Sequence, residues 1–485
     1  MARVVVLGAG VSGHTAAMHL RRKLSRKHEV VVITPNSQWN WIPSNIWVGT
    51  GRMPKEKVLF PLAPLYAKRG ITYVQAKAVA LHPEGTKENP APQVEFKYTS
   101  KERAGEVERL SYDYLINATG PKLKFEATPG LGPDQGNSLS VCTAAHAEET
   151  AKEFAKIVEA ARGGTPQRLV IGMGNGTCTC QGAAFEYTFN VEFELREAGV
   201  RDLCEVVYLT NETELGDFGV GGMRFKQNGF MTTSQLWTES LFRERGVKAI
   251  SGAAVKKVEK GQLTYETLDG EEHDLDFDFA MLLPPFSGQP MKAYDKDGND
   301  ITDVVFAPSG FMKVDADYSK TSYEEWSADD WPHTYQNPTY ENMFAVGIAF
   351  APPHAISKPR KSVNGTLIAP APPRTGQPSG TIGRAVADTI IDRIKGRGRP
   401  ARQASMAHMG ASCVASTGAS MGKGSAAAMI MFPVVPDERK YPLTGRHPYH
   451  TRGEIGLFGH WIKVLLHYMF LHKAKGRIGW TIIPE

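Results

Sequence analysis

The sequence predicts an α/β protein that contains two tandem folds of parallel strands and helices, followed by an amphipathic C-terminal segment. Two glycine-rich turns carry this prediction, because each follows a short apolar strand and precedes a helix-forming run. The turns begin at Gly8 and Gly172, so each can open a fold of its own. The tail places apolar and aromatic residues at helical spacing between positions 453 and 475. A chain of 485 residues is long enough for two or three domains.

The N-terminal turn has the clearest motif. An apolar strand over 4–7 is followed by GAGVSG at 8–13 and by a helix-forming run over 14–27. This is the G-x-G-x-x-G fingerprint in a Rossmann-like context, where glycines let the backbone approach a pyrophosphate at a helix N-terminus. We predict that the turn binds FAD or NAD, and the alternative is a glycine turn without a nucleotide. The residues expected to form it are Gly8, Gly10, Ser12 and Gly13.

Other N-terminal segments are expected around the same cofactor. The second strand, over 29–34, ends without the carboxylate that usually binds the adenosine ribose, so a hydroxyl or an amide would do so. A strand over 72–79 could pass the adenine. Three tryptophans between positions 39 and 47 form either a wall against a planar ring or a packed loop anchor. The residues expected here are Thr34, Asn36, Pro43, Ser44 and Val79.

Two later segments indicate how the chain leaves this first fold and returns to it. A strand ending in Ala118, Thr119 and Gly120 is the second fingerprint of two-dinucleotide flavoproteins. A strand and glycine turn at Gly347 stands where such proteins bring a third segment back to the FAD. Gly376 lies at the end of a proline- and glycine-rich stretch that is either an ordered loop over a ligand or a linker.

The expected domains follow from these segments. Residues 1–120 and 300–400 would form a discontinuous FAD-binding domain. Residues 121–299 would form a second Rossmann-like domain with two redox cysteines. Residues 401–485 would form a C-terminal region with a further redox cysteine and amphipathic membrane-anchoring helices.

The second glycine turn is broken. Thr177 and Cys178 stand where the third glycine and a small residue belong, and Cys180 precedes the expected helix. A thiol there would crowd a pyrophosphate, whereas a helix N-terminus lowers the pKa of a thiol and favours the reactive thiolate. The next strand, over 204–209, ends near Thr210 without the acid that an NAD ribose would need. We infer a nicotinamide site converted to sulfur chemistry, and the alternative is a turn with buried, inert cysteines.

Composition excludes several classes of protein. Hydrophobic residues make up 41% and charged residues 22%, as in globular proteins, and the net charge of +5 gives no support for a nucleic-acid partner. Five scattered cysteines do not make a disulfide scaffold, and no cysteine or histidine spacing suits a metal site. The chain opens directly on a strand instead of a signal peptide, so we expect it in the cytoplasm. The tail resembles an interfacial anchor, with Lys463, His467 and Lys473 on its polar face and the lysines toward lipid phosphates. A helix docked on the core or in a dimer is the alternative.

Over nearly its whole length the chain resembles the sulfide:quinone oxidoreductases of the flavin disulfide reductase superfamily. The resemblance is carried by GAGVSG, PSNIWVGTG, YDYLINATGPKL, SVCTAAHAEE, CQGAAFEY, FAVGIAFAPP and SCVASTG. It implies FAD as cofactor, sulfide as substrate, membrane quinone as acceptor and a membrane surface as the place of attachment. We therefore expect a peripheral, monotopic protein on the cytoplasmic membrane. We also expect a homo-oligomer.

The resemblance also implies site residues. The three cysteines of the family fall on Cys142, Cys180 and Cys413, with Cys178 as a competitor of Cys180. Cys180 and Cys413 would face each other at the flavin, take up sulfide sulfur and pass two electrons to FAD. The candidate proton acceptors are His146 and Glu186, and either could be structural. The candidate quinone residues are Phe350, Trp461, Tyr468 and Phe470.

Three other functions compete with this one. A sulfide dehydrogenase that passes electrons to a cytochrome would normally carry an export signal and no amphipathic tail. A type II NADH:quinone oxidoreductase would need an intact second glycine turn. A redox sensor that signals through a partner would normally carry a further domain. The sequence as given has an amphipathic tail and a broken second glycine turn, and it shows neither an export signal nor a further domain.

Overall fold

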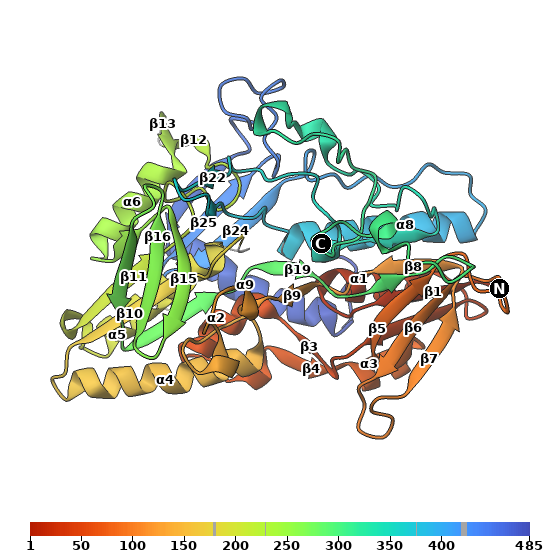
Figure 1. Cartoon of the computed structure of the whole chain (residues 1–485), viewed down its shortest axis with the longest axis horizontal. Coiled ribbons are helices and arrows are strands. Elements are labelled where there is room, and N and C mark those ends of the chain that lie inside the picture. Colours follow the sequence, from red (N-terminus) through yellow and green to blue (C-terminus); the bar gives the residue numbers. More distant parts are fainter. Residues whose placement is uncertain (178–180, 228, 375, 419–423) are drawn as a thin grey trace.

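The computed structural model describes residues 1–177, 181–227, 229–374, 376–418 and 424–485. Figure 1 shows two sheet-containing parts with the C-terminal segments between them in this view. The helices of the described part are α1 (Val11–Lys23), α2 (Asn45–Gly49), α3 (Leu62–Arg69), α4 (Ala144–Arg162), α5 (Gln181–Glu197), α6 (Ser234–Glu244), α7 (Thr302–Val305), α8 (Gly376–Ile394) and α9 (Leu457–Ala474).

The first sheet forms the N-terminal Rossmann-like fold. Its parallel part has the order β21-β8-β1-β2-β5, and β6 and β7 extend it antiparallel while β20 pairs with β5. Its central strand is wholly apolar after its first residue because helices cover both faces of such a sheet. The strands are β1 (Arg3–Leu7), β2 (Glu29–Thr34), β5 (Thr72–His82), β6 (Gln93–Tyr98), β7 (Val107–Ser111), β8 (Tyr114–Asn117), β20 (Lys292–Ala293) and β21 (Met343–Ala345).

The second sheet forms the second Rossmann-like fold. It is parallel throughout and has the order β14-β11-β10-β18, with an antiparallel meander β15-β16-β17 beside it. The predicted α/β class with two tandem folds is therefore confirmed. The strands are β10 (Gln167–Met173), β11 (Cys204–Leu209), β14 (Lys248–Ile250), β15 (Ala253–Glu259), β16 (Gln262–Thr267), β17 (Glu272–Asp276) and β18 (Phe279–Leu283).

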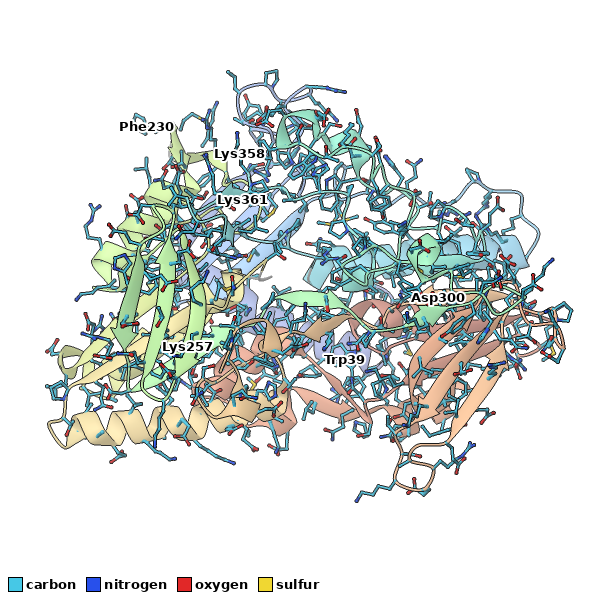
Figure 2. All side chains as sticks on the ribbon, viewed as in Figure 1. Trp39, Phe230, Lys257, Asp300, Lys358 and Lys361 are labelled. Carbon is cyan, nitrogen blue, oxygen red and sulfur yellow. The ribbon has the colours of Figure 1, made fainter. Side chains whose placement is uncertain are left out.

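The two folds are joined by a pair of crossovers that bond to each other. β9 (Pro121–Leu123) follows the first fold, β19 (Phe286–Gly288) follows the second, and the two pair antiparallel near the centre of Figure 1. The other short pairs are β3 (Gln38–Asn40) with β4 (Leu59–Pro61), β12 (Arg224–Gln227) with β13 (Phe230–Thr233), and β22 (Arg360–Lys361) with β23 (Leu367–Ile368). Phe230 stands at the outer tip of the β12–β13 hairpin (Figure 2).

The C-terminal part is a small antiparallel sheet covered by a helix. The sheet has the order β24-β25-β26, formed by Ala411–Ser416, Ala426–Met431 and Arg452–Gly456. Helix α9 packs on β24 and β25, and α5 of the second fold packs on β24. Within the described ranges, no helix has both the length and the apolar character needed to cross a bilayer. The predicted domain boundaries stay a prediction, although the first sheet draws strands from residues 3–117 and 343–345.

Candidate active site

The N-terminal turn is built by close contact between three backbone segments. Gly8 has a φ of +92°, and a Cβ atom on it would lie 2.2 Å from the Ala118 carbonyl oxygen. A Cβ on Gly13 would lie 2.2 Å from the Gly8 carbonyl oxygen. Only glycine fits at both positions, so β1, α1 and the Ala118–Gly120 segment are locked together.

The start of α1 is open, in contrast. Apart from the residues adjoining Gly10 in the chain, no described residue lies within 4 Å of a Cβ on Gly10, which is the N-cap residue, and no described side chain caps the helix. The first N–H groups of a helix have no partners within it and carry its positive end. This combination of open space and uncapped N–H groups fits the pyrophosphate of a dinucleotide.

A third segment meets the same turn. Gly347 has a φ of +65°, and a Cβ on it would lie 2.2 Å from Ser12 Oγ. Gly383 of α8 approaches the Ser12 carbonyl oxygen equally closely, at 2.4 Å from its Cβ position. Helix α8 begins at Gly376, where again the described residues leave space within 4 Å of the Cβ position. The turn at Gly347 therefore brings the N-termini of α1 and α8 into one place.

Arg374 anchors the approach to α8. Its side chain is buried, and Nη1 donates to the carbonyl oxygens of Ile348 at 3.0 Å and Phe350 at 2.6 Å. Burial lowers the pKa of this guanidinium to about 9. The proline- and glycine-rich stretch is thus an ordered loop at this end.

The remaining predicted cofactor residues lie at three separate places. Thr34 is buried at the end of β2, and its Oγ1 accepts a long hydrogen bond of 3.5 Å from the exposed Asn36 N–H. Val79 does not lie beside Thr34, because Thr34 pairs with Gln75, four residues earlier in β5. Ser44, next to Pro43 in the short helix η1 (Ile42–Ser44), is buried, and its Oγ bonds to His467 Nδ1 at 2.8 Å.

Cys142 lies at the entry to α4. Burial raises the pKa of its thiol to about 11, and its backbone N–H donates to Ser140 Oγ at 3.1 Å. Its neighbour Val141 is bonded through its carbonyl oxygen to Asn45 of α2. His146 is the third residue of α4, packs edge-on against Phe125, and has its pKa lowered by burial.

Cys413 lies beside the start of α5. A Cβ atom placed on Gly182 would lie 3.5 Å from Cys413 Sγ. Gly182 is the second residue of α5 and follows Cys180 by two positions in the sequence. Cys178 and Cys180 themselves lie outside the described residues, so the choice between them as partner of Cys413 stays a prediction.

Glu186 joins α5, β24 and α9. Its Oε1 accepts from the Ser416 N–H at 3.0 Å and from Ser416 Oγ at 2.8 Å, and its Oε2 pairs with Lys463 Nζ at 3.1 Å. Asn190, one turn along α5, donates to the Ser416 carbonyl oxygen at 2.8 Å, and Trp47 donates to Ser416 Oγ at 3.1 Å. Both carboxylate oxygens are therefore occupied. The role of Glu186 as a proton acceptor stays a prediction.

The orientation of α9 differs from the one expected from its sequence. The prediction placed Lys463, His467 and Lys473 on the polar face of an interfacial helix, with the lysines toward lipid phosphates, and all three are buried. Lys463 pairs with Glu186, His467 bonds to Ser44, and Lys473 pairs with Glu485 at 2.9 Å. The predicted polar face was wrong because each of these groups finds a buried partner on a distant segment.

The outward side of α9 is apolar and aromatic. Its residues recur at helical spacing, and more than half of each side chain is exposed. They are Phe458 (62%), Trp461 (54%), Leu465 (60%) and Tyr468 (63%). Such a row on one exposed helix face is typical of a surface that meets a membrane or a partner.

A hollow lies between α1, the start of α8 and the end of α9. Aromatic rings form one wall of it: Trp39 stacks on Trp41, and Trp41 stacks on Phe470 with ring centres 5.0 Å apart. Figure 2 labels Trp39 in the lower central part of the molecule. The tryptophan loop is thus an anchor for α9, and Trp41 also lines the hollow.

The four predicted quinone residues are not brought together. Phe470 lines the hollow, whereas Trp461 and Tyr468 lie on the outward side of α9. Phe350 is fully buried and packs edge-on against Tyr335 with ring centres 5.0 Å apart.

The second glycine turn is covered by another segment of the chain. Asn211 Nδ2 donates to the carbonyl oxygens of Gly176 at 3.0 Å and Ala369 at 2.8 Å. A Cβ on Gly219 would lie 2.2 Å from the Ala371 carbonyl oxygen. The segment around 369–371 therefore lies at the edge of the second sheet where a nicotinamide nucleotide would bind in a Rossmann-like fold.

Sequence reasoning missed several residues of this region. Glu212 follows Thr210 by two positions, but it is buried, and its carboxylate accepts from Thr210 Oγ1 at 3.0 Å and the Phe218 N–H at 2.6 Å. Burial and the nearby Asp217 raise the pKa of Glu212 to about 8. The roles of Ser416 and Lys463 were also missed, and the one local signal was a lysine inside an apolar helix.

Comparison with known proteins decides the family. The pyridine nucleotide-disulphide oxidoreductase family matches residues 2–283. A sulfide-quinone reductase from Aquifex aeolicus is 30% identical over 472 residues, which is 97% of this chain and 91% of that protein. The chain belongs to the sulfide:quinone oxidoreductase family. As a member of that family it is an oxidoreductase and a flavoprotein.

Solved structures agree with this family. The crystal structure of the sulfide:quinone oxidoreductase from Aquifex aeolicus matches with a TM-score of 0.73 and 28% identity, over 98% of this chain and 92% of that one. The mitochondrial sulfide:quinone oxidoreductase of Mus musculus is 24% identical over 354 residues, 71% of this chain and 64% of that protein. NDH2 from Plasmodium falciparum, at 13% identity and a TM-score of 0.65, shares the fold.

Proposed function

We propose that this family member is an FAD-dependent sulfide:quinone oxidoreductase. It oxidises sulfide at Cys180 and Cys413 and delivers two electrons to a membrane quinone. The observation that carries the proposal is the position of Cys413 Sγ against Gly182, two residues after Cys180. We propose that Cys180, which stands 233 positions earlier in the sequence (413 − 180), is the partner of Cys413 there.

The glycine turns support FAD as the flavin. Gly8, Gly10 and Gly13 would hold the pyrophosphate at α1, and Gly347 and Gly376 would approach the flavin from the return segment and from α8. Thr34 and Asn36 would bind the adenosine ribose. When bound, the flavin supplies the two-electron acceptor that the sulfur chemistry requires.

The cysteines supply the chemistry on the sulfide side. HS⁻ attacks one sulfur of the oxidised pair, the S–S bond breaks, and one cysteine becomes a persulfide while the other becomes a thiolate. When the thiolate sulfur rejoins the outer sulfur of the persulfide, two electrons leave for the acceptor and one proton leaves for a base or water. His146 and Glu186 remain the candidate bases. Repetition lengthens the sulfur chain until polysulfide leaves.

The C-terminal part supports attachment to a membrane. The outward row of α9 offers apolar and aromatic side chains, as interfacial helices do. The hollow beside Phe470 and Trp41 lies between the starts of α1 and α8 and the end of α9. We propose this hollow as the route by which quinone approaches the flavin. We propose a peripheral protein of the cytoplasmic membrane that forms homo-oligomers.

NADH is disfavoured as the electron donor. Asn211 Nδ2 donates to the carbonyl oxygens of both Gly176 and Ala369, so the segment at Ala369 is held beside the second glycine turn, where the nucleotide would lie. A dinucleotide bound in a Rossmann-like fold needs the space beside that turn.

The test is anaerobic stopped-flow absorbance of the purified flavoprotein, mixed first with sulfide and then with a soluble quinone. We expect sulfide to bleach the flavin and quinone to restore it in the wild type. The flavin of the Cys413→Ser variant should neither bleach with sulfide nor respond to the quinone that follows. Cys204→Ser, which changes a buried cysteine of β11 outside the site, should behave as the wild type. Reduction of the flavin by NADH, with no response to sulfide, would overturn the proposal in favour of an NADH:quinone oxidoreductase.

A further inference from the structure

A buried ion pair links the outward-facing helix α9 to the helix that follows Cys180. Lys463 Nζ and Glu186 Oε2 are 3.1 Å apart, and less than a tenth of either side chain is exposed. Removing two charges from water is costly, and a buried pair contributes little net stability compared with apolar packing. Its presence is better explained by the arrangement that it enforces.

That arrangement is a row of residues along α5. Gly182, Glu186 and Asn190 are spaced by four residues and therefore lie on one side of the helix. Cys413 Sγ lies 3.5 Å from the Cβ position of Gly182, while Glu186 and Asn190 bind the backbone N–H and carbonyl oxygen of Ser416. The row thus lies along β24 from the proposed redox cysteine, Cys413, to Ser416, which is three positions later.

Lys463 completes this contact from the other side. Glu186 uses one oxygen for Ser416 and the other for Lys463, so the ammonium group balances the only charge in the row. Lys463 extends inward from the same helix whose outward side carries Phe458, Trp461 and Leu465. The pair therefore connects the proposed membrane face to the strand that carries Cys413.

We propose that Lys463 is a positioning residue, which acts through Glu186 and Ser416 to fix β24 against α5 and so to set the place of Cys413. This inference rests on the proposed function for its meaning, since that function gives Cys413 its task. It differs from the reading of Glu186 as a proton acceptor, because a positioning pair depends on both partners together.

The two readings predict different double-variant behaviour. Lys463→Met leaves a buried, unbalanced carboxylate, so β24 should loosen. In the double variant Glu186→Gln/Lys463→Met no charge remains, and the amide oxygen can still accept from Ser416. The double variant should therefore be closer to the wild type than Lys463→Met is. If Glu186 acts as a base instead, Glu186→Gln removes that base equally whether residue 463 is lysine or methionine.

The experiment measures the rate at which iodoacetamide alkylates Cys413, read by peptide mass spectrometry after reduction with a phosphine. We expect Lys463→Met to raise the rate about tenfold and the double variant to return it to within about threefold of the wild type. The conservative variant Lys463→Arg should behave as the wild type. Lys440→Met, which changes an exposed lysine of the same C-terminal part, is the matched control.

Alkylation of Cys204 in the same samples separates positioning from general unfolding. Cys204 is buried in β11, so its labelling rises only when the fold opens. Equal rises at Cys204 and Cys413, or an unchanged Cys413 rate in Lys463→Met, would overturn the proposal. If Lys463→Met does not fold, Ser416→Ala decides, because loss of the hydroxyl should raise Cys413 labelling alone. None of these rates depends on sulfide oxidation, so failure of the proposed function would be recognised separately.

Discussion

His467 of α9 and Ser44 of the η1 turn are joined by a hydrogen bond of 2.8 Å between Nδ1 and Oγ, although 423 positions separate them in the sequence. Ser44 stands in the loop predicted to border the flavin, and His467 stands on the helix with the outward apolar row. The C-terminal part is therefore attached to the first fold by a neutral, buried histidine. Burial and nearby lysines lower the pKa of His467 to about 4.

This histidine predicts a loss of stability in acid. In the unfolded chain the imidazole has its ordinary pKa near 6.5, so below that pH the unfolded state binds a proton that the folded state does not. Stability should be fully present above pH 6.5 and fall as the pH is lowered toward 4. Thermal unfolding between pH 7.5 and 4.5 measures this, and His467→Gln should have a flatter profile than the wild type. His14, whose pKa burial also lowers to about 4, contributes in the same direction and would remain in the variant. An identical slope in His467→Gln would contradict the assignment to His467.

The outward row of α9 predicts binding to lipid vesicles. Each side chain of this size contributes about 1.5–3 kcal/mol when its surface is fully buried, so the pair Phe458→Ser/Leu465→Ser should weaken vesicle binding about tenfold or more. Co-sedimentation with phospholipid vesicles measures the partition. Val363→Ser removes an apolar side chain that is even more exposed but lies in the β22–β23 loop, and this variant should bind vesicles as the wild type does. Equal binding by all three proteins would contradict the role of α9.

The contact between Gly347 and Ser12 predicts that Gly347→Ala damages the cofactor site. The substitution strains a left-handed backbone, at about 1–2 kcal/mol, and also forces its Cβ into Ser12 Oγ. Gly365→Ala is the matched control, because Gly365 has a φ of +86° but no described atom within 4 Å of its Cβ position. The ratio of flavin to protein absorbance should fall sharply in the first variant only. Equal flavin content in both would show that the α1–Gly347 contact does not shape the site.

Arg374 predicts a further loss of flavin and stability. Arg374→Met leaves the carbonyl oxygens of Ile348 and Phe350 without their donor, at a cost of about 1–3 kcal/mol for each buried group that loses its partner. Urea unfolding should show the loss of stability, and the flavin should dissociate at a lower urea concentration. Arg384→Met changes a half-exposed arginine of the same helix α8 region and should be close to neutral. A neutral Arg374→Met would mean that the loop before α8 is held by other contacts.

Local signals predicted the parts of this protein that local chemistry determines. The fingerprint at 8–13 and the strand before Gly120 each combine an apolar strand with a glycine in the turn that follows it. The structure contains both strands and both glycine turns. The fold class followed from them. These signals can be read from the sequence because each glycine follows its strand within a few positions.

The errors have a common physical origin. The inner side of α9 was predicted to be a polar face toward lipid phosphates because Lys463, His467 and Lys473 are polar. Each is instead matched by a group more than ten positions away, on α5, on η1 or at the C-terminal residue. Charge pairing between distant segments leaves no periodic trace in one sequence. Glu212 was overlooked for the same reason, since its burial depends on Phe218 and the loop beyond it.

The inner contacts of α9 also determine how a detergent-free version of this protein should be made. Cutting the chain before Leu457 would remove the apolar row, but it would also strip Glu186 and Ser44 of their partners and remove Phe470, on which Trp41 stacks in the wall of the hollow. Helix α9 therefore both holds internal segments together and forms the outward apolar surface. A water-compatible enzyme should keep α9 and exchange only its outward residues for polar ones.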